Sequence, residues 1–130
     1  LTPLFMKYPR LRFHLLHAGY PWTGEAACLA KMYPNVTLDL TWTQIIVPEG
    51  AREALGHMLD MVPSNKIHVF GGDHLVPESV WGALEVTREN VAHVLAEKVG
   101  AGYYTETEAV DLARRLFHDN AVGIFGLGDD

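Results

Sequence analysis

Acidic and imidazole side chains follow three apolar stretches of this sequence. His17 ends the first stretch (LRFHLLH), the segment from Asp39 to Trp42 ends the second (VTLDLTW), and Asp73 follows the third (IHVFGG). Carboxylates and imidazoles bind divalent metals, and they transfer protons near neutral pH. The pattern therefore favours metal-binding or acid–base chemistry at the ends of these stretches.

Each of these residues also has a plain structural interpretation. Asp73 is either a turn or helix-capping residue in front of a helix that begins at Pro77, or a metal ligand and general base. His17 is either a hydrogen-bonded polar residue or a functional residue at the end of its stretch. For His74 we favour a solvated side chain over a role behind the metal ligands.

His14 and His17 have the spacing of a paired metal site, HxxH. On a strand, however, an odd spacing sends the two side chains to opposite faces of the sheet. These histidines are therefore not expected to bind one ion together, and His17 is preferred because it stands at the carboxyl end. His68, in the middle of its stretch, receives no predicted role.

Arg88 lies in a helical stretch after Asp73 (EVTREN). An arginine there is either a surface ion-pair partner or a bidentate clamp for a substrate carboxylate. Nucleophilic catalysis is not predicted, because Cys28 lies within an alanine-rich helical stretch and neither serine is in a nucleophile-elbow motif.

Strand-like and helix-like stretches alternate along the chain. We predict strands at residues 11–17, 36–40 and 67–70, with 36–40 in the middle, and helices at residues 23–33, 48–62, 77–99 and 105–118. Residues 105–108 (TETE) form a capping box at the start of the last helix. Strands separated by helices indicate an α/β fold with a parallel sheet, whose functional residues collect at the carboxyl ends of the strands.

The composition limits the class of protein. With 130 residues and 48% hydrophobic content, the chain is expected to form one domain. A net charge of −6 without a basic stripe argues against nucleic acid and membrane surfaces as partners. A single cysteine, with no signal peptide or membrane-spanning run, favours a cytoplasmic protein. The chain begins at Leu1 within a helix-like stretch, which suggests a fragment of a longer protein.

The motifs HAGYP, YPNVTLDLTW, KIHVFGGDH and ARRLFHDNAVGIFGL occur in this order over nearly the whole chain. With them the sequence resembles the carboxyl-terminal portion of amidohydrolase-superfamily barrels, in particular the "amidohydrolase 2" branch related to uronate isomerases. The resemblance implies a partial (β/α)8 TIM barrel, with residues 11–17, 36–40 and 67–70 as strands six, seven and eight. It also implies one or two divalent metals, usually zinc, in the complete barrel.

The resemblance implies roles for three residues. Asp73 matches the strand-eight aspartate, which binds metal and takes or gives a proton. His17 matches the strand-six histidine, which polarises the substrate or metal-activated water, and Arg88 lies where an arginine binds an acidic substrate. The family's ligands on strands one and five have no counterpart here, so the chain alone is expected to bind zinc weakly or not at all.

Two functions remain open. In the first, residues 1–130 are a single unit, the carboxyl-terminal part of a metal-dependent hydrolase that acts on a small and in some cases acidic substrate. In the second, the chain is a non-catalytic half-barrel that serves assembly. Because three strands cannot close a barrel, we expect either a homo-oligomer or pairing with a missing amino-terminal half.

Overall fold

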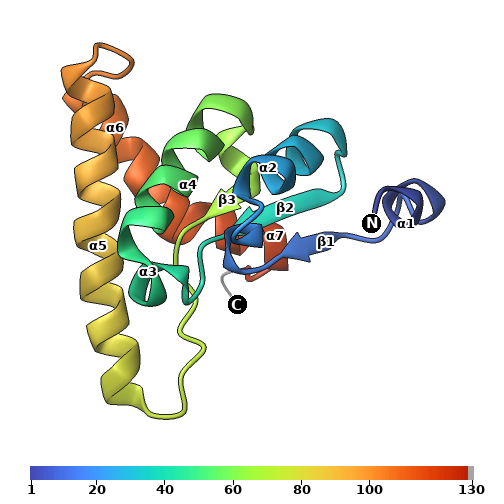
Figure 1. Ribbon diagram of the computed structural model, residues 1–130, viewed down its shortest axis with the longest axis horizontal. Coiled ribbons are helices and arrows are strands. Elements are labelled where there is room, and N and C mark those ends of the chain that lie inside the picture. The colour runs from blue at the N-terminus through green and yellow to red at the C-terminus, as the bar shows by residue number, and fades with distance from the viewer. Residues whose placement is uncertain (129–130) are drawn as a thin grey trace.

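Three short parallel strands form the centre of the structure, a computed structural model that describes residues 1–128 (Figure 1). The strands are β1 (Phe13–Leu15), β2 (Val36–Asp39) and β3 (Ile67–His68). They lie in the order β1-β2-β3, and both neighbouring pairs are parallel. The α/β class, the parallel pairing and the central position of the second strand are confirmed.

All three strands are shorter than predicted. β1 stops at Leu15 because His17 and Ala18 adopt φ angles of 60° and 57°, which an extended strand does not allow. Beyond β3, the amide of Val69 donates to Leu116 O at 3.2 Å. The chain after β3 is therefore attached to the carboxyl-terminal segment.

Two helices connect the strands and cover one face of the sheet. α2 (Thr23–Met32) joins β1 to β2, and α4 (Pro48–Met61) joins β2 to β3, close to the predicted ranges. A short helix that the sequence analysis missed, α3 (Thr43–Ile46), precedes α4. One hydrophobic core holds the buried sides of α2, α4 and the sheet. Its members include Ala27, Ala30, Leu38, Leu55, Met58, Ile67 and Val69.

The other helices lie before β1 and after β3. α1 (Thr2–Lys7) and α5 (Pro77–Gly100) stand at opposite ends of the view in Figure 1. α6 (Glu106–Arg114) begins at the predicted capping box, which is confirmed. Thr105 Oγ1 accepts a hydrogen bond from Glu108 N (3.2 Å), and Glu108 Oε2 accepts one from Thr105 N (2.8 Å).

The helix predicted at residues 105–118 is divided. α6 ends at Arg114, a π-helical turn spans Arg115–Asp119, and α7 covers Asn120–Phe125. The side-chain amide of Asn120 donates to Ser64 O and Ile67 O, each at 2.6 Å, beside a 3₁₀ turn at residues 64–66. These bonds hold the carboxyl-terminal segment against β3.

Side chains of the sheet alternate between an apolar and a polar face. Leu38 and Ile67 are fully buried in the core with α2 and α4. His14, Asp39 and His68 have the opposite parity along their strands, so they point to the other face. Asp39 and His68 are register partners, which makes them neighbours on that polar face.

The two edges of the sheet differ. The carboxyl-terminal segment lies beside β3, whereas β1 has no strand partner on its outer edge within residues 1–128. In the same part of the chain, no helix has both the length and the apolar character that crossing a bilayer requires.

Truncating a core side chain of α4 is expected to destabilise the fold. Leu55 is fully buried, so Leu55→Ala should lower the free energy of unfolding by about 2–5 kcal/mol through lost burial and a new cavity. Leu75→Ala is the matched control, since Leu75 is fully exposed, and it should change the value by less than about 0.5 kcal/mol. Urea denaturation measures both, and equal midpoints would contradict the position of α4.

Candidate functional site

The carboxylate of Asp39, at the end of β2, is buried on the polar face of the sheet. Its Oδ1 accepts hydrogen bonds from the backbone N–H of His17 (2.9 Å) and of Thr41 (3.0 Å), and its Oδ2 accepts one from the Thr41 hydroxyl (2.7 Å). Two imidazole nitrogens also lie against Oδ2, His14 Nε2 at 3.2 Å and His68 Nε2 at 3.4 Å. Asp39 therefore contacts groups that belong to, or directly follow, all three strands.

Burial and hydrogen bonding act in opposite directions on this carboxyl. Burial raises the pKa of Asp39, but hydrogen bonds from His14, His68 and Thr41 outweigh it and hold the pKa well below its usual range. Asp39 is therefore ionised at neutral pH, and it presents a negative charge to the two histidines.

His17 stands beyond the end of β1 in a 3₁₀ turn (His17–Gly19). Its ring Nδ1 lies 2.8 Å from Thr41 O. A carbonyl oxygen only accepts hydrogen bonds, so Nδ1 carries a proton, and in the neutral imidazole Nε2 has the lone pair. The end of β2 thus fixes both the position and the tautomer of this imidazole, as is usual for histidines that bind a metal or accept a proton.

Left-handed backbone angles gather at the carboxyl ends of the strands. The φ angle is 60° at His17, 57° at Ala18, 65° at Trp42 and 43° at Asp73. Such conformations cost non-glycine residues on the order of 1–3 kcal/mol each, and they cluster at ligand-binding and catalytic sites. One or two of them follow each strand, so strain concentrates at this edge of the sheet.

Gly71 allows the segment after β3 to approach the end of β2. A Cβ atom at this position would lie 2.2 Å from Thr41 Oγ1, which is far inside van der Waals contact. The glycine is therefore required for close approach rather than for a left-handed turn. It brings the chain next to the same hydroxyl that bonds Asp39.

Asp73 lies on the irregular segment between β3 and α5 and is exposed. The amino-terminal cap of α5 is Val76, and no side chain caps it, so the helix-capping interpretation of Asp73 does not hold. His74 is half-buried, and its Nε2 is buried without a hydrogen-bond partner, which corrects the expectation of a solvated side chain. The roles of Asp73 as metal ligand and base stay predictions.

Arg88 lies on α5 with an exposed side chain. Its Nη1 is 2.6 Å from Glu85 Oε1, and its guanidinium lies 5.9 Å from the centre of the Trp81 ring. The surface ion pair that the sequence left open is thus present. Binding of a substrate carboxylate by Arg88 stays a prediction.

His14, Asp39 and His68 form a group that the sequence analysis did not assemble. Within residues 1–128 they are the only set of three or more histidine, cysteine or acidic side chains whose ligand atoms could surround one ion, lying within 4.8 Å of one another. Neither His17 nor Asp73 belongs to this group, which we call the buried cluster. The sequence does show that each of the three residues is a polar residue within an apolar strand. That they share one face of the sheet becomes evident only once the pairing register is known.

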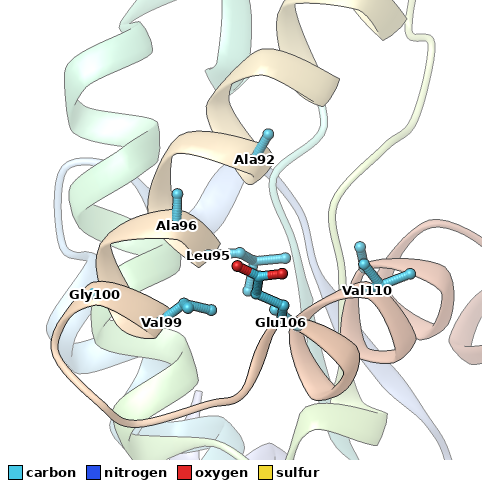
Figure 2. Close-up of a pocket in the computed structure, with 9 residues that line it drawn as sticks. Ala92, Leu95, Ala96, Val99, Gly100, Glu106 and Val110 are labelled. Carbon is cyan, nitrogen blue, oxygen red and sulfur yellow. The ribbon is translucent and has the colours of Figure 1, made fainter.

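A groove between α5 and α6 offers no comparable chemistry (Figure 2). Its volume is about 610 Å³, and its lining includes Leu95, Val99 and Val110. Glu106 is the only ionisable side chain in that lining. A single carboxylate among apolar residues provides neither a metal site nor an acid–base pair.

Comparison with known proteins identifies the family of this chain. The sequence profile of the amidohydrolase family matches residues 1–127. The chain belongs to the amidohydrolase family. This match confirms the resemblance carried by the HAGYP and VFGGDH motifs.

Two proteins similar to this amidohydrolase chain are much longer. Protein fluG of Emericella nidulans is 35% identical over 130 residues, which cover 99% of this chain and 15% of fluG. A crystal structure of a candidate metal-dependent hydrolase from Lactobacillus casei ATCC 334 is similar with a TM-score of 0.74 and 19% identity, over 96% of this chain and 34% of that one. At this identity the second similarity shows a shared fold, and the chain spans only part of either protein.

Removing the Asp39 carboxylate is expected to destabilise the amidohydrolase chain strongly. Asp39→Ala leaves the buried donors around it without an acceptor, which should cost about 3–5 kcal/mol in the free energy of unfolding. Asp60→Ala is the matched control, because Asp60 pairs with Lys98 at the surface with half of its side chain exposed, and it should cost less than about 1 kcal/mol. Chemical denaturation that gives equal losses would argue against Asp39 as the centre of the site.

Proposed function

We propose that this chain is part of a metal-dependent hydrolase whose reaction takes place at the carboxyl ends of β1, β2 and β3. The observation that carries this proposal is the imidazole of His17. Its Nδ1–H donates a hydrogen bond to Thr41 O and its backbone N–H donates one to Asp39. These bonds fix the ring past the end of β1, so Nε2 is the ring nitrogen that remains for a metal or a proton. The residues with left-handed φ angles also follow the strands, and this clustering supports a reaction site at the same edge of the sheet.

In this proposal the three strands are strands six, seven and eight of a (β/α)8 barrel, and residues 1–130 are its carboxyl-terminal part. Helices cover the outside of such barrels, and active sites lie at the carboxyl ends of the strands. The placement of α2 and α4 on one face is compatible with this arrangement. The unpaired edge of β1 would then pair with the preceding strand of the same barrel.

Asp73 would bind the metal and accept a proton from the attacking water, and His17 Nε2 would bind the metal or accept a proton. In its present tautomer His17 donates to a developing oxyanion only after it has been protonated. A divalent ion, which we take to be zinc, supplies water activation and carbonyl polarisation when bound. A catalytic zinc needs three protein ligands, so His17 and Asp73 would share it with residues outside this chain.

The substrate in this proposal is a small molecule, and Arg88 would favour one that carries a carboxylate. Arg88 would have to exchange its partner Glu85 for the substrate, which is feasible for an exposed ion pair because such pairs contribute little to stability.

Substitution of the proposed catalytic residues in the complete protein should reduce turnover. We expect His17→Gln and Asp73→Asn each to lower kcat by about 10²–10⁴-fold, the usual range for loss of a general acid or base. The assay is hydrolysis of a panel of small amides, esters and lactones with and without a carboxylate. Chelation should abolish the activity, and Zn²⁺ should restore it.

The matched controls for this experiment are His118→Gln and Asp60→Asn, whose side chains lie at the surface and are 72% and 50% exposed. Both should keep the wild-type kcat. Undiminished turnover in His17→Gln and Asp73→Asn, with folding intact, would exclude the proposed roles.

Residues 1–130 produced alone should associate. Large apolar side chains near the strand ends and the edge of β1 are exposed, with Leu11 at 55%, Leu16 at 50% and Trp42 at 45% exposure. In the barrel these surfaces would be covered by the rest of the protein, and in isolation a second copy would cover them. Sedimentation at micromolar concentration should therefore show a species larger than the 14.4 kDa monomer. A clean monomer would count against an open barrel edge.

A further inference from the structure

We infer that the buried cluster of His14, Asp39 and His68 is a second metal site, separate from His17 and Asp73, that binds a divalent transition ion such as Zn²⁺. Each strand of the sheet contributes one of its ligands. Two imidazoles and a carboxylate are a donor set that zinc accepts, with a fourth position for water. The inference does not rest on the proposed hydrolase function.

Two of the three distances between the ligand atoms are long for charged hydrogen bonds and match the spacing around a zinc ion. Hydrogen bonds between a charged imidazole and a carboxylate are usually about 2.7–2.9 Å long. Asp39 Oδ2 lies 3.2 Å from His14 Nε2 and 3.4 Å from His68 Nε2. Neighbouring ligand atoms around a tetrahedral zinc ion with bonds of about 2.0–2.1 Å are about 3.3–3.4 Å apart.

Surrounding hydrogen bonds hold two of the three ligands in place. Both oxygens of Asp39 are oriented by His17 N–H and by the amide and hydroxyl of Thr41. His14 Nδ1 lies 2.7 Å from Thr37 Oγ1, which directs its Nε2 toward Asp39. Ligands fixed in this way by outer groups are typical of metal sites.

His68 uses only one of its two ring nitrogens toward Asp39. Its side chain is 6% exposed, and its Nδ1 is buried without a hydrogen-bond partner. A polar atom buried in this way costs on the order of 1–3 kcal/mol, which an apolar residue would avoid. Its ring stacks on that of His14, with centroids 4.5 Å apart and an interplanar angle of 2°, and Nε2 of each ring lies near Asp39 Oδ2. Because an imidazole binds a metal in the plane of its ring, at least one of the two rings has to turn when an ion enters.

The cluster is closed on one side and accessible on another. The ring of Phe125 from α7 meets both imidazoles edge-on, at centroid distances of 5.4 Å and 5.6 Å. The side chain of His14 is 17% exposed, on the edge strand β1. His17 lies past the end of β1 with its ring turned to Thr41, outside this cluster.

The test compares the zinc content of the complete protein that carries this chain, after loading with Zn²⁺ and gel filtration. His68→Leu removes one ligand and fills its space with an apolar side chain, a replacement that buried polar sites often tolerate. We expect it to retain one Zn²⁺ fewer per chain than the wild type. The matched control is His93→Gln on α5, an exposed histidine that pairs with Glu97, and it should keep the wild-type content.

A double variant, His17→Gln/Asp73→Asn, separates the two sites. If the inference is right, this variant keeps the Zn²⁺ of the buried cluster, whatever its activity. Equal zinc content in the wild type and His68→Leu, or complete loss of zinc in the double variant, would overturn the second site. Neither result would bear on the proposed hydrolase function.

Nitrogen NMR of the wild-type imidazoles gives a readout that needs no variant to fold. Adding Zn²⁺ to metal-free protein should shift the Nε2 resonances of His14 and His68 and leave that of His93 in place. Unchanged resonances of His14 and His68 would show that these histidines only donate hydrogen bonds to Asp39, and the inference would fall.

Discussion

The structure depends on the burial of one charge, the carboxylate of Asp39, inside the sheet. An ionised carboxylate is stable in the interior only where hydrogen bonds and positive groups replace the lost water. The backbone of His17 and Thr41 supplies fixed donors, and ring nitrogens of His14 and His68 complete the surroundings. Because these groups come from all three strands, satisfying Asp39 also fixes the strand ends relative to one another.

This arrangement separates stability from chemistry across the thickness of the sheet. Leu38 and Ile67 point into the hydrophobic core with α2 and α4, which supplies most of the driving force for folding. Within residues 1–128 the helices that connect the strands leave the opposite face uncovered, and Phe125 of α7 meets it beside His14 and His68. This face holds the charged and imidazole side chains. Along each strand, alternate side chains point into the core and stabilise the fold, and the side chains between them present the candidate ligands.

Local patterns of the sequence predicted the parts of the fold that local physics determines. Helical spacing located α4, the TETE motif located the start of α6, and alternation of elements gave the parallel order of the strands. The buried cluster was missed because its members lie in separate strands, and only the register Asp39 to His68 brings them together. Register depends on long-range packing, which local patterns of one sequence do not reveal. The π-helical turn before Asn120 depends in the same way on contacts with β3.

The two groups of candidate ligands differ in what orients them, and this difference bears on their use. The donors of the buried cluster are set by strand pairing and by hydrogen bonds within this chain, so their positions are fixed before an ion binds. Asp73 is exposed on an irregular segment whose approach to the sheet relies on the contact of Gly71 with Thr41. A catalytic metal must keep a position open for substrate, and that requirement favours ligands at the exposed strand ends.

Asp39 on β2 links the two groups. Its Oδ2 is the ligand atom of the buried cluster, and its Oδ1 accepts a hydrogen bond from the backbone N–H of His17. An ion in the cluster would therefore stiffen the support of His17 without taking part in the reaction.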